Sequence, residues 1–202
     1  MYFSCTTFGF ILSLLHGLIK MKHIIALSGD IGGGKSSVAT ALQQLLGYDV
    51  IGTGAIQRTI AQKRGVTTLE LNKISQTDRS IDDEIDTFVI NLGKTGDKLI
   101  IDSRLAWHFI PKAFKVFLSV DPLLGAERVF SASRSDEDNP SLQKTLENNA
   151  RRQAFEDERF QKLYDVKFRE PGNYDLVVDT SHDSPEQIAA QIKSHFEQWL
   201  LK

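Results

Sequence analysis

The stretch Gly29-Asp30-Ile31-Gly32-Gly33-Gly34-Lys35-Ser36 decides the fold of this chain. It has a glycine, four residues and then Gly-Lys-Ser, which is the Walker A spacing of loops that bind nucleoside triphosphates. Glycines let the backbone bend tightly around an anion and turn successive amide N–H groups toward it. We expect Lys35 to reach the β and γ phosphates and the Ser36 hydroxyl to bind Mg²⁺.

The sequence on both sides of this loop supports that interpretation. Residues 23–27 form a short apolar run, which is typical of a central parallel strand buried on both faces. Residues 36–46 have helical spacing, and the N-terminus of such a helix favours anions. We therefore expect the loop, from Gly29 through Ser37, to bind ATP. The alternative is a purely structural glycine-rich turn.

Further strands are predicted at 48–51, 98–101, 115–120 and 176–178. They alternate with helical segments at 36–46, 54–64, 68–76, 81–92, from Asp121-Pro122 onward, 141–164 and 184–201. This alternation predicts an α/β fold of three layers, α/β/α, around a largely parallel sheet. The charged helices at 54–64, 68–76 and 81–92 are interpreted as facing the surface. The polar stretch 131–140 is predicted to be a loop, within a mobile lid around 131–160.

Composition limits the classes of partner. The formal net charge is −2, which lacks the basic excess of proteins that bind nucleic acid, so we expect no such partner. The single cysteine, Cys5, excludes an internal disulfide and a cysteine-rich zinc site, which suits the cytoplasm.

Residues 1–20 are treated as an N-terminal extension and 21–202 as one domain. The apolar run at 8–19 is too short to span a bilayer and contains His16, and no clear signal peptide is present. Met21 stands directly before the first strand, which suggests a mis-assigned start. A segment that packs on the domain or associates with a membrane is the alternative, although no membrane partner is expected.

Asp102 ends the apolar run Leu99-Ile100-Ile101. A carboxylate at that position would help Ser36 to hold the metal ion, as in the Walker B strand of such proteins. Acidic residues at strand ends are common, so the spacing alone leaves a structural role open.

Beyond the loop, the chain resembles the cytidylate kinase branch of the nucleoside monophosphate kinases, especially its short archaeal-type members. The resemblance rests on three segments that occur in the family's order. They are Tyr-Asp-Val-Ile-Gly-Thr-Gly-Ala-Ile-Gln-Arg at 48–58, Ile-Asp-Ser-Arg-Leu at 101–105 and Asn-Tyr-Asp-Leu-Val-Val-Asp-Thr-Ser at 173–181. It implies a P-loop kinase fold with five parallel strands in the order 2-3-1-4-5. It also implies transfer from Mg²⁺-ATP to CMP or dCMP, giving CDP or dCDP.

The resemblance also implies roles for individual residues. Thr53 and Arg58 would face the acceptor monophosphate, and Arg104 would bind its phosphate, since guanidinium groups clamp phosphates in a bidentate way. Arg152, Glu156 and Arg159 repeat the family's lid spacing, and there the arginines stabilise the transferring phosphoryl group while the carboxylate helps to read the acceptor. The same three residues could instead form a surface ion-pair ladder.

Two departures from the family concern the acceptor. The helix at 81–92 has no basic residue before Lys94, although family members often carry an arginine there, and Ser103 replaces a glycine. Another small-molecule kinase, or a nucleotide-binding regulator with weak turnover, therefore stays open. The expected partners are ATP and a small phosphorylated acceptor, and the expected state is a monomer.

Overall fold

The structure is a computed structural model, and it describes residues 23–67, 70–71, 74–75, 78–132 and 141–202. The N-terminal extension 1–20 lies outside the described residues. So do much of the helix predicted at 68–76 and most of the polar loop predicted at 131–140.

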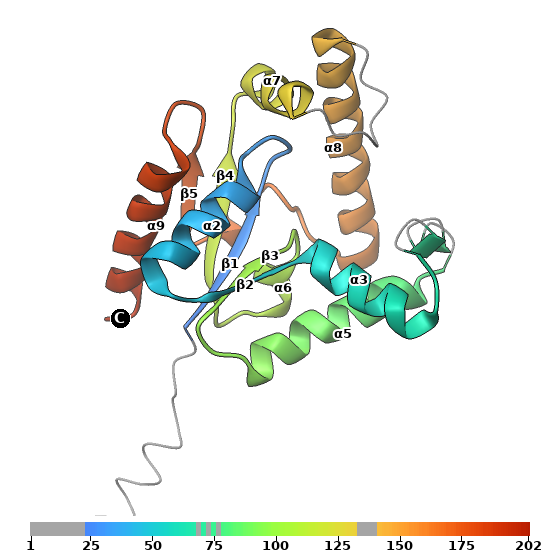
Figure 1. The fold of residues 1–202 in the computed structure, drawn as a ribbon, viewed down its shortest axis with the longest axis horizontal. Helices are drawn as coiled ribbons and strands as arrows, with labels where there is room; N and C mark the ends of the chain where they lie inside the picture. The colour runs from blue at the N-terminus through green and yellow to red at the C-terminus, as the bar shows by residue number, and fades with distance from the viewer. Residues whose placement is uncertain (1–22, 68–69, 72–73, 76–77, 133–140) are drawn as a thin grey trace, which may run out of the picture.

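The centre of the fold is a parallel sheet of five strands in the order β2-β3-β1-β4-β5 (Figure 1). Both the fold class and the strand order predicted from the sequence are confirmed. The strands are β1 (Ile24–Gly29), β2 (Asp49–Gly52), β3 (Leu99–Asp102), β4 (Phe114–Ser119) and β5 (Leu176–Asp179).

Strand β1 connects the two halves of the hydrophobic core. Ile24 and Ala26 pack into one cluster, Ile25 and Leu27 pack into the other, and none of the four is exposed to solvent. This alternation follows from the strand period of two and explains why the run reads as continuously apolar.

Helices cover both faces of the sheet. The cluster around Ile25 is closed by α2 (Lys35–Leu46) and α9 (Pro185–Trp199), which lie side by side in Figure 1. The cluster around Ile24 is closed by α3 (Thr53–Arg64), α5 (Ser80–Thr95) and the short α6 (Ala106–Phe109). Helix α6 was not predicted, because four residues are too few to show helical periodicity.

Two further helices stand together beyond the carboxyl ends of the strands (Figure 1). They are α7 (Pro122–Ser131) and the long α8 (Leu142–Tyr164), and a 3₁₀ turn, η1 (Pro171–Asn173), lies between α8 and β5. The start predicted for α7 is confirmed, since the Asp121 carboxylate accepts hydrogen bonds from the N–H groups of Leu123 and Leu124. The start of α9 is a capping box of Ser184 and Gln187.

The backbone of the phosphate loop packs directly against the backbones of β4 and α7. Gly32 has φ +80°, and a Cβ atom there would lie 2.3 Å from the carbonyl oxygen of Gly125 in α7. A Cβ on Gly29 would lie 2.4 Å from the carbonyl oxygen of Leu118 in β4. Only glycine permits approaches this close, so the loop's position depends on both residues.

Gly125→Ala tests this packing. The new Cβ would lie 2.8 Å from the carbonyl oxygen of Ile31 and must displace the loop. Such overpacking costs about 1–3 kcal/mol, which outweighs the gain of about 0.8–1 kcal/mol in helix propensity. We expect a lower melting temperature and weaker ATP binding, measured by thermal unfolding and calorimetry.

Gly172→Ala is the matched control, because its Cβ would meet nothing within 4 Å. A Gly125→Ala protein that binds ATP normally and melts at or above the wild-type temperature would show that the loop does not depend on this contact.

Candidate active site

A cavity of about 510 Å³ opens at the carboxyl edge of the sheet, next to the phosphate loop. Residues 31–37 line one side, and the other sides include five of the predicted site residues: Thr53, Arg58, Asp102, Arg104 and Arg152. Open parallel sheets bind ligands at such a carboxyl edge, where the strand order reverses. We call this the phosphate cavity.

Lys35 lies in the first turn of α2 and turns back over the loop. Its Nζ donates hydrogen bonds to the carbonyl oxygens of Gly29 and Asp30, both at 3.0 Å. Gly29 and Asp30 therefore contribute carbonyl groups to Lys35 and do not line the cavity. Burial, and then the nearby charge of Arg104, lower the pKa of Lys35 to about 8.

Ser36 and Asp102 lie together as the metal prediction requires. The Ser36 hydroxyl donates to Asp102 Oδ2 at 3.5 Å, and β3 pairs with β1 so that Asp102 lies opposite Leu27. Burial raises the pKa of Asp102, while the charges of Lys35 and Arg104 oppose that shift.

These two oxygen donors fit Mg²⁺. Mg²⁺ commonly takes one or two protein oxygens and completes its shell with water and phosphate oxygens. Within the described part of the chain, no cluster of three or more His, Cys, Asp or Glu residues could hold a metal by itself.

A second cavity of about 410 Å³ continues from the first, and both are lined by Thr53, Arg104 and Arg152. We call it the acceptor cavity; its walls come from α3, α5, the β3–α6 segment and α8. The Thr53 hydroxyl donates to the carbonyl oxygen of Asp102 at 3.1 Å, which ties the start of α3 to β3. The buried Ser28 hydroxyl lies 3.0 Å and 3.1 Å from the carbonyl oxygens of Ser103 and Arg104 and fixes the backbone that carries Arg104.

Glu156 joins two of the predicted arginines. Its carboxylate accepts a hydrogen bond from Arg104 Nε at 2.6 Å and another from Arg152 Nε at 3.2 Å. Arg104 comes from the β3 end and the other two residues from α8, so this ion triad connects α8 to the carboxyl edge of the sheet.

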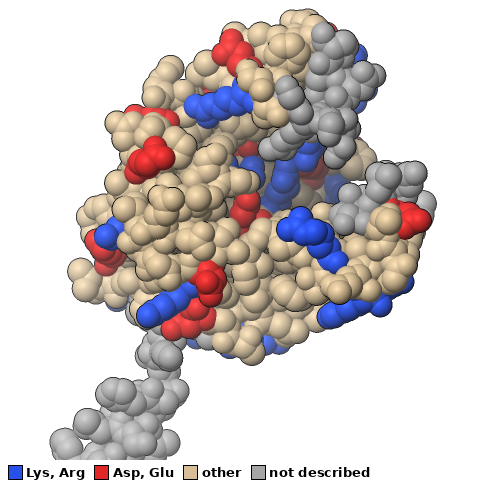
Figure 2. Space-filling view, in the orientation of Figure 1, with Lys and Arg blue, Asp and Glu red and all other residues tan. Residues whose placement is uncertain are grey.

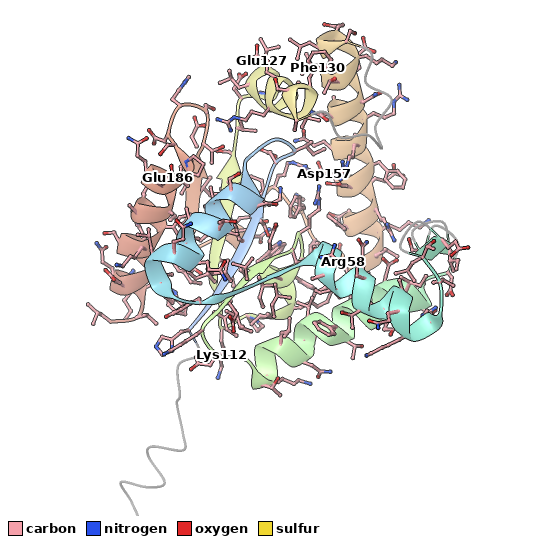
Figure 3. The ribbon with its side chains drawn as sticks, in the orientation of Figure 1. Arg58, Lys112, Glu127, Phe130, Asp157 and Glu186 are labelled. Carbon is pink, nitrogen blue, oxygen red and sulfur yellow. The ribbon has the colours of Figure 1, made fainter. Side chains whose placement is uncertain are left out.

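Arg58 and Arg159 lie apart from this triad. Arg58 projects from α3 on the side of the phosphate cavity, with α8 opposite (Figure 3). Arg159 lies seven residues beyond Arg152 on α8, about 10 Å along the helix axis, and donates to Asp82 Oδ2 at 2.5 Å. It lines the acceptor cavity and not the phosphate cavity, so the two lid arginines are not together at the phosphate loop.

The interpretation that the helix at 81–92 faces the surface is wrong for one side of α5. Asp82 and Asp86 line the acceptor cavity, and Ile81 and Val89 of the same helix are buried. The four-residue spacing of the two aspartates places them on one face. The apolar residues at 81, 85, 88, 89 and 92 were the available signal for a buried side.

The sequence also did not predict a salt-bridge network between the phosphate loop, α8 and the segment after α8. Arg169 Nε donates to Asp30 Oδ1 at 3.0 Å, and Arg169 Nη1 donates to Asp157 of α8. Figure 3 shows Asp157 on the side of α8 that faces the loop. These contacts connect α8 to the loop, but Arg169 belongs to no motif in the sequence.

The charges around the site are visible on the surface. In Figure 2, lysine and arginine side chains gather in a hollow near the middle of this face, with carboxylates between them. A hollow lined by cations and closed in part by their own carboxylates suits polyanionic ligands.

Comparison with known proteins then identifies the family. The model of the cytidylate kinase-like family matches residues 24–182. The chain belongs to the cytidylate kinase-like family. It is 32% identical to the cytidylate kinase of Natronomonas pharaonis over 173 residues, which cover 85% of this chain and 88% of that protein. It is 34% identical to the cytidylate kinase of Haloarcula marismortui over 167 residues, which cover 82% of this chain and 84% of that one.

Two other similarities are more limited. The chain is 35% identical over 178 residues to the S-adenosylmethionine-dependent nucleotide dehydratase of Lacinutrix mariniflava, covering 88% of this chain but only 36% of the dehydratase. The shikimate kinase of Acinetobacter baumannii has a TM-score of 0.58 at 18% identity, over 92% of this chain and 99% of that one. At that identity the likeness concerns the fold alone.

The predicted resemblance is therefore confirmed, and the chain is a P-loop kinase of this family. Kinases of this kind use ATP with Mg²⁺ and a nucleotide acceptor. Among the residues that the structure describes, no helix is long and apolar enough to cross a membrane.

Lys35→Ala is expected to lower turnover about a hundredfold or more, which corresponds to about 3 kcal/mol of transition-state stabilisation. The reason is that Lys35 is the cation of the loop, whereas its contacts with the protein are two backbone carbonyls. Steady-state release of ADP measures the effect, and the melting temperature checks that the fold is intact. The exposed Lys112, remote from the site in Figure 3, gives the control Lys112→Ala. Near wild-type turnover of Lys35→Ala would contradict this role.

Proposed function

We propose that this kinase transfers the γ-phosphoryl group of ATP to a nucleoside monophosphate, with CMP or dCMP as the acceptor and CDP or dCDP as the product. The observation that carries the proposal is the junction of two cavities at Thr53, Arg104 and Arg152. One cavity contains the phosphate loop, and the other is large enough for a nucleoside. A donor and an acceptor phosphate would meet where two arginines already lie.

On the donor side, the loop amides and Lys35 would hold the β and γ phosphates. Lys35 would exchange two neutral carbonyl oxygens for charged phosphate oxygens, which bind an ammonium group more strongly. Ser36 and Asp102 would hold Mg²⁺, whose charge offsets the negative charge on the phosphate oxygens.

On the acceptor side, Arg104 would clamp the monophosphate, with Thr53 and Arg58 beside it. Glu156 engages Arg104 through Nε, which leaves both Nη groups for a bidentate contact with phosphate. Glu156 thereby fixes the plane of the guanidinium group. An acceptor phosphate is already an anion, so the reaction needs no general base, and catalysis would consist of positioning and charge neutralisation.

Helix α8 would act as part of a lid. Arg152 already lines the phosphate cavity, whereas Arg159 is held by Asp82. For Arg159 to reach the transferring phosphoryl group it must leave Asp82, which requires α8 to move toward the phosphate loop. Such closure would exclude water from the reaction and so favour transfer over hydrolysis.

The choice of CMP or dCMP rests on the cytidylate kinases among the relatives. A kinase for another small molecule would release ADP with an acceptor that lacks a nucleobase. A nucleotide-binding regulator would release little ADP with any acceptor. Measuring ADP release from Mg²⁺-ATP with CMP, dCMP, UMP, AMP and shikimate separates the three cases.

Arg104→Ala tests the acceptor site. Loss of a phosphate clamp is expected to lower kcat/KM for the acceptor tenfold to a thousandfold, equivalent to about 1.4 to 4 kcal/mol. All nucleoside monophosphates should suffer alike, because each carries the same phosphate. Calorimetry should show a much smaller change in ATP affinity.

Arg151→Ala is the control, since Arg151 is exposed on α8 and lines neither cavity. If Arg104→Ala strongly weakens ATP binding but preserves transfer at saturating ATP, Arg104 belongs to the donor site and the assignment is wrong.

A further inference from the structure

The acceptor cavity carries opposite charges toward its two ends. Arg104 and Arg152 lie where it meets the phosphate cavity, whereas Asp82 and Asp86 line the acceptor cavity and not the phosphate cavity. Contacts along α8 give the direction. Asp82 bonds to Arg159 and Asp86 bonds to Tyr164, and these partners lie seven and twelve residues beyond Arg152. A ligand with its phosphate at the arginines would therefore extend toward the aspartates.

The two aspartates differ in how many of their hydrogen-bond acceptor positions remain available to a ligand. Asp82 is paired with the guanidinium group of Arg159 at 2.5 Å. Asp86 forms no ion pair with any residue in the described ranges, and its contact is the Tyr164 hydroxyl, which donates to Oδ2 at 2.8 Å. An ionised carboxylate accepts about four hydrogen bonds. Asp86 thus keeps acceptor capacity that the fold does not use.

Keeping this carboxylate inside the molecule is unfavourable for the fold. Burial raises the pKa of Asp86 to about 6, and the charges of Asp82 and Asp83 add to that shift, while the Tyr164 hydroxyl and Arg79 oppose it. Like charges four residues apart on a helix also destabilise it. At neutral pH the group is still ionised. A costly, under-used carboxylate in a ligand cavity indicates a binding role.

The aromatic residues that line the acceptor cavity with Asp86 suit a flat ligand ring such as a nucleobase. Phe109, Phe160 and Tyr164 also line the acceptor cavity, and their rings contact one another through Tyr164, at centroid distances of 5.5 Å to Phe109 and 6.5 Å to Phe160. Aromatic walls accept the faces of a nucleobase, and a carboxylate in the same cavity accepts from N–H groups at the edge of the base.

We propose that Asp86 determines the specificity for the acceptor base by accepting a hydrogen bond from an exocyclic amino group. This rests on the function proposed above. The kinase would then prefer bases with an amino group, cytosine or adenine, over the oxo-bearing uracil and hypoxanthine. An oxo oxygen and the carboxylate are both hydrogen-bond acceptors, so the two groups would face each other without a hydrogen bond. A site built to bond a polar group rejects the mismatched analogue strongly.

The test compares kcat/KM for two acceptor pairs that differ by amino against oxo, CMP with UMP and AMP with IMP. Wild type should prefer the amino member of each pair at least tenfold. In Asp86→Asn the preference should fall at least tenfold, because an amide can turn its NH₂ group toward an oxo oxygen. Asp83→Asn is the matched control on the same helix, since Asp83 is exposed and lines neither cavity, and its preference should stay unchanged.

The pH dependence gives a second readout that a purely structural role would not produce. Lowering the pH through about 6 protonates Asp86 and turns an acceptor into a donor, so the CMP-to-UMP ratio of wild type should fall, while that of Asp86→Asn stays flat. The titratable and charged groups that act on Asp86 are Tyr164 of α8, Asp82 and Asp83 of α5, and Arg79 directly before α5. Using a ratio cancels the protonation of the acceptor phosphate, which both nucleotides share.

Thermal stability gives an independent check. The pKa of Asp86 is raised in the folded state, so its stabilising contribution is complete below the unfolded value and is lost as the pH rises through about 6. Asp86→Asn should therefore melt at a higher temperature than wild type at pH 7.5, with a smaller difference at pH 5. A lower melting temperature of Asp86→Asn at pH 7.5 would mean that the carboxylate supports the fold.

The outcomes separate the two proposals. Equal use of CMP and UMP by wild type, or an equal loss for both in Asp86→Asn, would overturn base reading by Asp86 and leave the kinase reaction intact. Absence of transfer to every nucleoside monophosphate would overturn the proposed function and, with it, this inference.

Discussion

The site depends on how closely the phosphate loop approaches its neighbours. Gly29 lies against Leu118 of β4 and Gly32 against Gly125 of α7, at distances that leave no room for a Cβ atom. These contacts fix the loop to the centre of the sheet, so its amides, Lys35 and the start of α2 take one arrangement. Because β1 is flanked by β3 and β4, the same arrangement places Asp102 and Arg104 across from the loop. The backbone packing thus determines where the proposed donor and acceptor phosphates would meet.

The cations of the site are held by the protein's own polar groups. Lys35 bonds to two carbonyls, Arg104 and Arg152 share Glu156, Arg159 bonds to Asp82, and Arg169 bonds to Asp30 and Asp157. Such pairing limits the repulsion among cations before phosphate binds, and a phosphate's greater charge can replace a carboxylate or carbonyl. Three of these bonds join α8 or the segment after it to the sheet edge, α5 or the loop: Arg104 to Glu156, Arg159 to Asp82 and Arg169 to Asp30. Exchange of partners on binding would therefore change the position of α8, which links charge neutralisation to the proposed closure.

The parts of the fold and of the site that the sequence predicts are those that belong to a recognisable motif or to the family pattern. The phosphate loop and the Ser36–Asp102 pair follow from motifs at the ends of the neighbouring strands β1 and β3, whereas the position of Thr53 and the strand order followed from the family resemblance. The Asp86–Tyr164 contact joins residues 78 positions apart, and the Arg169–Asp30 contact joins residues 139 apart. No motif contains Asp86, Tyr164 or Arg169, and the charges on α5 were interpreted as a solvated face. Arg152 and Arg159 repeat the family's spacing, but Arg152 bonds to Glu156 of its own helix whereas Arg159 bonds to Asp82 of α5. The roles of these side chains stay predictions until they are tested.

The proposed reaction transfers a phosphoryl group from ATP to a nucleotide, which differs from merely binding or hydrolysing ATP. ³¹P NMR of the protein with Mg²⁺-ATP and CMP tests it directly, because it identifies each phosphorus-containing product. With transfer, the signals of ATP and CMP should fall together while those of ADP and CDP rise in equal amounts, with little inorganic phosphate. Formation of inorganic phosphate without CDP, at a rate independent of CMP, would contradict it.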